Sequence, residues 1–236
     1  MAKVLYLDDS YLKEFDAVVT SVKDDKFIIL DQTAFYPSSG GQPNDEGILV
    51  KDGEKFKVVF VGKFDGEISH EIDHSGLNKG DKVHCIIDWE RRYKLMQAHT
   101  SSHVLSTLIH EETGALISGN QLGVDKNRID FNLEDYNGEK MIEYVQRANE
   151  ILKRNLDVSI AYMPREDALK IPSMVKLAGV LPPNIATLRI VSIGDFDTQA
   201  DGGTHVHNTS EIGSLEFLKS DNKGKGNRRV YYRINY

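Results

Sequence analysis

The chain has 236 residues, of which 40% are hydrophobic and 28% charged, and its formal net charge is −7. These values are typical of a globular chain with one large domain or two ordinary ones. They argue against indiscriminate nucleic-acid binding, DNA included, because such binding needs a basic surface. No segment approaches the ~18 apolar residues of a membrane helix or signal sequence, and the single cysteine excludes an intrachain disulfide, so we expect a cytoplasmic protein without a membrane partner.

The N-terminal part reads as a series of short strands. Brief apolar runs alternate with turn residues, a rhythm that favours a small barrel or sandwich. We predict a β-barrel domain over residues 1–90. Its strands are expected near 4–7, 15–22, 26–32, 47–50, 56–62, 67–72 and 82–89.

One segment interrupts this rhythm. Residues 34–47, AFYPSSGGQPNDEG, contain two prolines and the adjacent Gly40 and Gly41, and they predict a loop. Paired glycines allow another chain or domain to approach the backbone closely. A plain surface connection is the alternative.

The second half is expected to be an α+β domain with a mainly antiparallel sheet, over residues 91–236. The strongest helix pattern runs from Trp89 to a C-terminal stop at Gly114. A second helix is expected at 139–155. Strands are predicted at 128–133, 158–163 and 188–193, with a closing hairpin of 214–220 and 228–234.

Two groups of potential metal ligands lie in this half. His99 and His103 occupy positions i and i+4 of the first helix, so they share one face, but the glutamate of a metalloprotease helix is absent between them. Asp201, His205 and His207 surround a Gly-Gly turn much later in the chain. Two ligands from each group would make a four-ligand zinc site. Alternatively, Asp201 caps the turn and the histidines face a packed surface or solvent.

The motifs together resemble the AlaX family, free-standing relatives of the editing domain of alanyl-tRNA synthetase. The resemblance covers nearly the whole chain, including a glycine-rich segment at 30–47, the HTSSH helix at 89–106, RIDF at 128–131, DGGTHV within 194–213 and KGKGNRR at 223–229. The barrel plus editing domain is similar to the medium-length form of the family. The family has the two-domain α+β fold predicted above, with an α/β-sandwich editing domain.

The resemblance implies one Zn²⁺ per chain, held by His99, His103, Asp201 and His205. Asp201 stands where the family usually has cysteine. Zinc accepts a carboxylate oxygen, but a thiolate selects zinc more strongly, so this departure bears on the identity and affinity of the metal.

The implied activity is hydrolysis of the ester bond in tRNA(Ala) mischarged with serine, or with glycine. In this interpretation the metal either activates water or positions the substrate. His99, His103 and Ser102 would be catalytic. The remaining implied contacts are with substrate at Ser118, Asn120, Gln121 and Thr204, and with tRNA at Gly40, Gly41, Lys223, Lys225, Arg228 and Arg229.

Further interpretations remain open at this level. Secondary candidates for phosphate contacts are Arg91, Arg92 and Lys94, at the start of the helix that carries His99 and His103. The basic tail, residues 216–236, can instead be a solvated hairpin with ordinary surface charge. Asp201 could have disabled the metal site and left a tRNA-binding protein. A deacylase for seryl-tRNA(Thr) is the third alternative, because the editing domain of threonyl-tRNA synthetase uses a related HxxxH arrangement.

Overall fold

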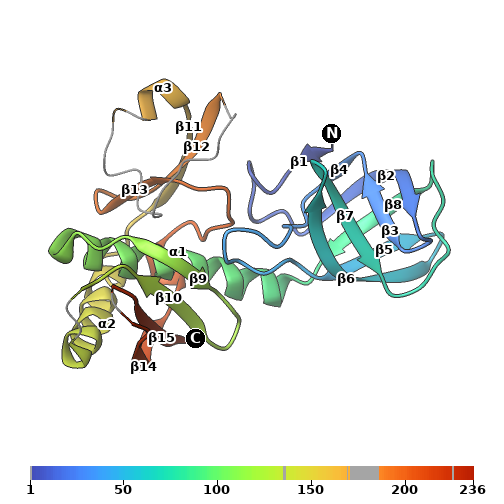
Figure 1. Cartoon of the computed structure of the whole chain (residues 1–236). Coiled ribbons are helices and arrows are strands. Elements are labelled where there is room, and N and C mark those ends of the chain that lie inside the picture. Colours follow the sequence, from blue (N-terminus) through green and yellow to red (C-terminus); the bar gives the residue numbers. More distant parts are fainter. Residues whose placement is uncertain (1, 135–136, 169, 171–185, 225) are drawn as a thin grey trace. The chain divides into compact units, whose positions relative to one another are not determined.

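The computed structural model describes residues 2–134, 137–168, 170, 186–224 and 226–236 (Figure 1). Contacts divide the chain into two compact units, Met1–Leu95 and Met96–Tyr236. The division falls inside helix α1 (Trp89–Thr113), whereas the sequence predicts a boundary near residue 90. Both units fit the predicted α+β class, with antiparallel sheets and few helices. None of the helices in the described part of the chain is long and apolar enough to cross a bilayer.

The first unit is a closed barrel, which confirms the predicted architecture. Its six strands follow each other around the barrel in the order β2-β3-β7-β6-β5-β8 (Figure 1). A short parallel pair, β1 (Lys3–Val4) with β4 (Gln32–Thr33), accompanies them. The barrel strands are β2 (Glu14–Lys23), β3 (Phe27–Leu30), β5 (Gly47–Lys51), β6 (Glu54–Phe64), β7 (Glu67–Ile72) and β8 (Lys82–Ile87).

Alternation along the strands fills the barrel interior. In β8, Val83, Cys85 and Ile87 are buried while the residues between them are partly exposed, the period expected of a strand with one inward face. Burial raises the pKa of the Cys85 thiol. Cys85 is therefore a small apolar residue of the barrel core.

The glycine-rich loop is tied to the start of α1 by a buried ion pair. Arg92 and Asp45 are both fully buried, and the Arg92 guanidinium also donates to the carbonyls of Ser10 and Ala34. The Asp45 carboxylate in turn accepts the backbone N–H of Tyr36. Arg92 is thus a structural anchor of the loop, and its buried guanidinium does not present a phosphate contact.

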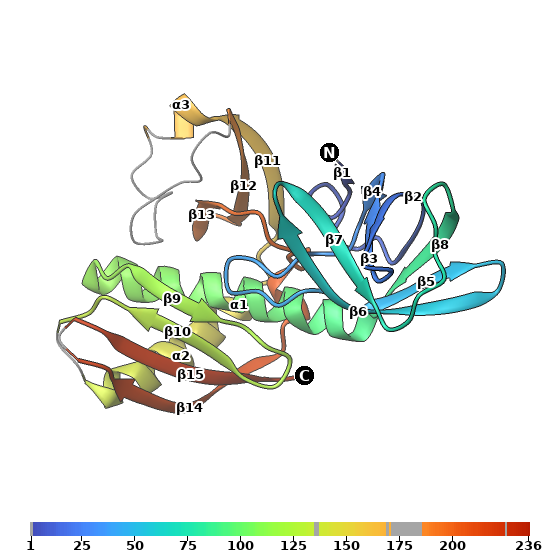
Figure 2. The same ribbon diagram turned by 45° about the vertical axis from the view of Figure 1, so that its right-hand side comes forward.

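The second unit contains a four-stranded antiparallel sheet in the order β14-β15-β10-β9. Figures 1 and 2 show α1 and α2 on the same face of this sheet. The Ser101 hydroxyl of α1 lies 3.0 Å from the Tyr232 hydroxyl, and Asn149 of α2 donates to the Leu215 carbonyl over 2.8 Å. The elements are β9 (Ile117–Gln121), β10 (Asn127–Phe131), α2 (Gly138–Leu152), β14 (Ser214–Asn222) and β15 (Arg228–Asn235).

A smaller antiparallel sheet, β11-β12-β13, completes this unit. Its strands are β11 (Val158–Pro164), β12 (Thr187–Ile193) and β13 (Asp197–Ala200), with the short helices α3 (Arg165–Ala168) and η2 (Thr209–Glu211) nearby in sequence. The sequence analysis did not predict β9 or β13. The DGGTH segment begins directly after β13, so this unpredicted strand positions half of the candidate site.

Candidate metal centre

Helix α1 is buried although its centre is rich in hydroxyl groups. The hydroxyls of Ser101, Ser102 and Ser106 donate to carbonyls one turn earlier in the helix, over 2.8, 2.8 and 3.1 Å. A buried hydroxyl costs little free energy when its donor is satisfied in this way. The helix can therefore carry two histidines into the interior of the unit although hydroxyl residues lie between them in the sequence.

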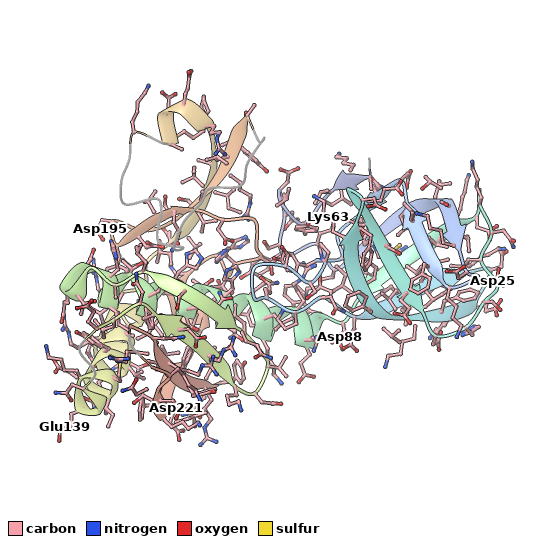
Figure 3. All side chains as sticks on the ribbon, viewed as in Figure 1. Asp25, Lys63, Asp88, Glu139, Asp195 and Asp221 are labelled. Atoms are coloured by element: carbon pink, nitrogen blue, oxygen red, sulfur yellow. The ribbon has the colours of Figure 1, made fainter. Side chains whose placement is uncertain are left out.

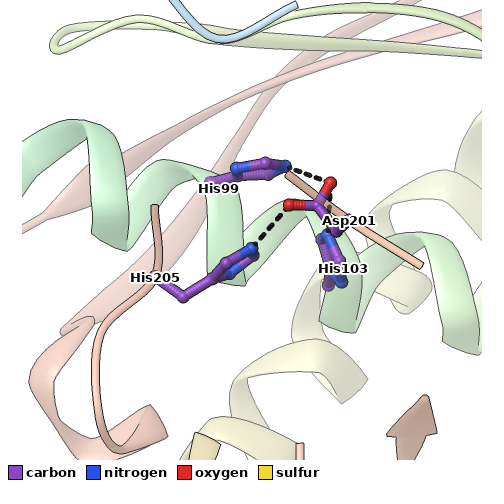
Figure 4. A group of neighbouring side chains, drawn as sticks. All are labelled: His99, His103, Asp201 and His205. Carbon is purple, nitrogen blue, oxygen red and sulfur yellow. Dashed lines mark hydrogen bonds and ion pairs between the residues drawn. The ribbon is translucent and has the colours of Figure 1, made fainter. Parts of the chain in front are cut away.

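Four side chains meet at the centre of the second unit (Figure 4). They are His99 and His103 from α1, and Asp201 and His205 from the turn after β13. One candidate ligand atom from each lies within 4.8 Å of all the others. The three histidines are 5%, 5% and 2% exposed, and the Asp201 side chain is 19% exposed. The two sequence motifs, far apart along the chain, thus converge on one buried spot.

All three imidazoles turn the same ring nitrogen to the carboxylate. Nε2 of His205 lies 3.0 Å from Oδ1 of Asp201, while Nε2 of His99 and of His103 lie 3.5 and 3.9 Å from Oδ2. Three nitrogens and one oxygen thus converge, a donor set that zinc accepts. Tetrahedral zinc, with bonds of ~2.0–2.1 Å, places its ligand atoms roughly 3.4 Å apart. The cluster needs only a small contraction to reach that spacing, so its residues fit the metal.

The turn that carries Asp201 is shaped around the His99 ring. A Cβ on Gly203 would lie 2.1 Å from Cε1 and 2.2 Å from Nδ1 of His99, whereas one on Gly202 would meet no atom within 4 Å. The Asp201 carboxylate also accepts the Gly203 N–H over 2.6 Å. Arg189 on β12 also stabilises the turn, because its guanidinium donates to the Asp201 carbonyl over 2.9 Å.

Burial and the neighbouring groups shift the pKa values of three residues in the cluster. Burial, reinforced by the charges of His99 and His103, holds the pKa of His205 well below its usual value. Burial also acts to lower the pKa of His103, but hydrogen bonds to Asp197 and Asp201 outweigh it and raise that pKa to about 9. Burial favours the neutral form of Asp201, yet the surrounding histidines hold its pKa well below normal. The cluster therefore presents an ionised Asp201 carboxylate beside a neutral His205 imidazole, both competent metal ligands, whereas His103 must release a proton before it can bind a metal.

The other residues predicted near the metal have different positions. His207 is exposed, and its backbone N–H donates to Glu211 over 2.9 Å, so it lies outside the four-residue cluster. Thr204 is fully buried. Ser102 is 3% exposed, and its hydroxyl proton is directed at the His99 carbonyl, which leaves its oxygen able to accept.

The predicted substrate contacts on β9 divide between two faces of the sheet. Gln121 pairs with Arg128, whose other partner Tyr231 lies on the opposite face from Tyr232 and α1. Gln121 therefore points away from the helix that carries the histidines. Asn120 pairs with the buried Ile129 on the helix side and is half-buried, and Ser118 is exposed.

The predicted tRNA-contacting residues differ in how far they are exposed to solvent. Gly40 and Gly41, with φ of 56° and 83°, form the tip of a tight turn closed by Ser39 and Gln42, where Gly40 is exposed and Gly41 is half-buried. Both have the left-handed backbone that glycine adopts most readily. Lys223 is exposed and lies 3.4 Å from Asp221.

Two arginines of the tail make internal contacts instead. Arg228 is 6% exposed and donates to the Asn222 side chain and to the carbonyls of Gly224 and Glu134, so it braces the hairpin and does not offer its guanidinium to a phosphate. Arg229 binds both carboxylate oxygens of Asp130, over 2.7 and 2.8 Å. Lys225 lies outside the described residues.

The residues that face the Nδ1 atoms of the clustered histidines could not be predicted from the sequence. Asp197, 3% exposed, faces Nδ1 of His103 at 3.1 Å, and the Thr100 hydroxyl lies 3.1 Å from Nδ1 of His205. Thr100 stands inside the quoted HTSSH motif, but its partner is fixed only by the tertiary fold. Asp197 could not be singled out from the sequence, because it is one of several polar residues before the Gly-Gly turn.

Comparison with known proteins agrees with this architecture. Residues 188–231 match the family described as threonyl and alanyl tRNA synthetase second additional domain, and residues 2–91 match tRNA synthetases class II (A). Alanyl-tRNA editing proteins AlaX-M from Saccharolobus solfataricus and Methanosarcina acetivorans are 48% and 47% identical, each over 99% of both chains. An alanine--tRNA ligase from Pyrococcus furiosus is 39% identical over 98% of this chain, which spans 25% of that ligase.

Proposed function

Because the chain belongs to the AlaX-M family of alanyl-tRNA editing proteins, and is therefore an aminoacyl-tRNA deacylase, we propose that it hydrolyses seryl-tRNA(Ala), and also glycyl-tRNA(Ala), at a centre that binds one Zn²⁺. The convergence of His99, His103, Asp201 and His205 within 4.8 Å carries this proposal. We place the activity in the cytoplasm, where the composition of the chain predicts it to be.

The chemistry required is cleavage of an ester. A zinc ion bound by the four residues would supply a Lewis acid for a carbonyl oxygen, for a water molecule or for the substrate amino group. His99 and His103 would bind the ion through Nε2 atoms from one face of the helix, and the turn would supply Nε2 of His205 and a carboxylate oxygen of Asp201. Their burial restricts the water around the reacting ester, which strengthens electrostatic interactions there.

Selection of serine over alanine requires recognition of one hydroxyl group. A buried acceptor that binds the serine hydroxyl is left unpaired by alanine, so alanine binds less favourably. The oxygen of Ser102, buried beside His99 and with its own proton committed to a carbonyl, is the acceptor we propose. Asn120 and Thr204 are further candidates for substrate contacts; the outward orientation of Gln121 removes it from the proposal.

The proposed tRNA contacts are those that the fold leaves accessible. The tip at Gly40 and Gly41 allows backbone groups to approach the sugar-phosphate chain, and Lys223 offers an exposed charge. Arg229 remains a candidate because its half-buried guanidinium lies at the sheet surface, whereas Arg228 is committed inside the hairpin.

The test is serine release from seryl-tRNA(Ala) by the His99→Ala variant, with His207→Ala as the matched control. We expect His99→Ala to abolish deacylation and lose zinc, and the exposed His207→Ala to retain both. Full activity in His99→Ala would contradict the metal-centre assignment.

The choice of tRNA is tested by comparing two substrates. If the protein cleaved seryl-tRNA(Thr) as fast as seryl-tRNA(Ala), or faster, the result would favour a threonine-system deacylase. Tight tRNA binding with no metal and no turnover would identify a binding protein with a disabled site.

A further inference from the structure

Each histidine of the cluster can bind a metal through Nε2 only if its proton sits on Nδ1. Imidazole carries one proton in its neutral form, and a hydrogen bond to the other nitrogen decides which nitrogen keeps it. The groups that face the Nδ1 atoms are therefore as important to a metal site as the ligands. One such group, a buried carboxylate behind His103, has no role in the deacylation described above.

This carboxylate belongs to Asp197 on β13. Its side chain is fully buried, and one of its oxygens lies 3.1 Å from Nδ1 of His103. The Thr107 hydroxyl donates to the other oxygen over 2.8 Å. A buried carboxylate is costly unless such partners satisfy it, and these contacts fix its position behind the ring.

Gln199 permits two assignments of the proton. Its Nε2 lies 2.6 Å from the same Asp197 oxygen and 2.7 Å from Nδ1 of His103. If the amide donated to an unprotonated Nδ1, the His103 proton would sit on Nε2 and block the metal. However, an unprotonated Nδ1 would also face the carboxylate with its lone pair, which is repulsive. Donation by both His103 and Gln199 to Asp197 removes this repulsion from the carboxylate, and it leaves the two nitrogens in contact without a hydrogen bond between them.

We propose that Asp197 is a positioning residue that keeps the proton of His103 on Nδ1 and so directs its Nε2 lone pair at the metal. This inference rests on the proposed metal centre and adds to it a residue that is not itself a ligand. Hydrogen-bonding partners of this kind raise the basicity of a ligating imidazole and fix its orientation, and their loss typically weakens metal binding about 10- to 100-fold.

The first experiment measures zinc affinity, without tRNA, by competition with a chromogenic chelator. We expect Asp197→Ala to weaken zinc binding about 10- to 100-fold. Asp197→Asn should weaken it less, because its amide oxygen can still accept the Nδ1 proton. Asp195→Asn is the matched control: Asp195 is two positions away on the same segment but 82% exposed at the surface (Figure 3), and it should leave the affinity unchanged.

A double-mutant cycle separates positioning from a general structural role. If Asp197 acts through His103, Asp197→Ala should cause no further loss of zinc affinity when His103 is already alanine. A loss of the same factor in both backgrounds would overturn the inference, as would equal zinc affinity for Asp197→Ala and the parent protein. Gln199→Leu gives an independent check, because tighter zinc binding in this variant would show that Gln199 holds the opposite tautomer.

The outcome is distinguishable from that of the deacylase assay. Asp197-dependent zinc binding without serine release would contradict the proposed function and leave the inference standing. Serine release, together with a zinc affinity that does not change when Asp197 is substituted, would support the proposed function and contradict the inference about Asp197. Circular dichroism of each variant identifies any variant that has lost its fold. If Asp197→Ala does not fold, the zinc affinity of Asp197→Asn is compared with that of the parent protein instead.

Discussion

Gly202 and Gly203 stand side by side in the turn after β13, but only Gly203 is required by its surroundings. The His99 ring occupies the space of a Cβ at Gly203, while the space beside Gly202 is open. A short sequence motif therefore contains one glycine that shapes the metal centre and one that does not. The sequence shows two equivalent glycines, because the ring that distinguishes them arrives from a helix about a hundred residues earlier.

This asymmetry predicts different effects for two alanine substitutions. Gly203→Ala should displace the His99 ring or the turn and lower both bound zinc and the deacylation rate by at least tenfold, equivalent to ~1.4 kcal/mol. Gly202→Ala should remain close to the parent protein. Zinc content and single-turnover serine release measure the two effects. Equal behaviour of the two variants would contradict the packing of His99 against the turn.

Asp201, a proposed metal ligand, carries a carboxylate that thiol reagents do not modify. The chain's single thiol, Cys85, is buried in the barrel, and burial raises its pKa, so little reactive thiolate exists. We expect N-ethylmaleimide to leave zinc content and activity unchanged in the parent protein. Metal-free Asp201→Cys should be inactivated by the reagent, and its holo form should bind zinc more tightly. Loss of activity in the treated parent protein would contradict this account.

Among the elements, those with a clear apolar period could be predicted from the sequence, and short polar ones could not. The barrel strands alternate buried and exposed residues, as β8 does. The strands β9 and β13, ISGNQ and DTQA, are short and polar, and only pairing with β10 and β12 defines them. Residues that face the Nδ1 atoms of the cluster, such as Asp197 on β13, therefore could not be predicted from the sequence, whereas the four clustered residues were all candidates there.

The barrel contains a buried histidine that makes its stability depend on pH. His70 on β7 is fully buried, with Nδ1 at 3.0 Å from the Ile28 carbonyl and Nε2 at 2.9 Å from the Thr33 hydroxyl, and burial lowers its pKa to about 4. The unfolded chain takes up a proton near the usual value of 6.5, while the folded barrel does not until about pH 4. The folded state therefore loses stability as the pH falls through this window.

The expected loss between pH 6.5 and pH 4 is on the order of 3 kcal/mol, from the size of the pKa shift. Urea unfolding at several pH values measures it. His70→Gln should show a flatter decline than the parent protein over this range, and the difference between the two curves isolates His70 from the titrating carboxylates. Parallel curves would show that the His70 ring is protonated or exposed in the folded barrel.

At the scale of the whole molecule, the chain combines a net charge of −7 with a tRNA-editing family. Composition alone argued against indiscriminate nucleic-acid binding, but it could not show which charged side chains are available to contact tRNA. The basic tail illustrates the reason: Arg228 and Arg229 look alike in sequence, yet one braces a hairpin from within and the other pairs with Asp130. The sequence shows which residues are charged. Only the fold shows whether a charged side chain already has a partner inside the protein.

The most direct test of the central claim is release of serine from seryl-tRNA(Ala) before and after removal of the metal, with alanyl-tRNA(Ala) as the control. The four-residue centre predicts rapid serine release that stops on chelation, returns when zinc is restored, and spares alanine throughout. Serine release at an undiminished rate from metal-free protein would contradict the account.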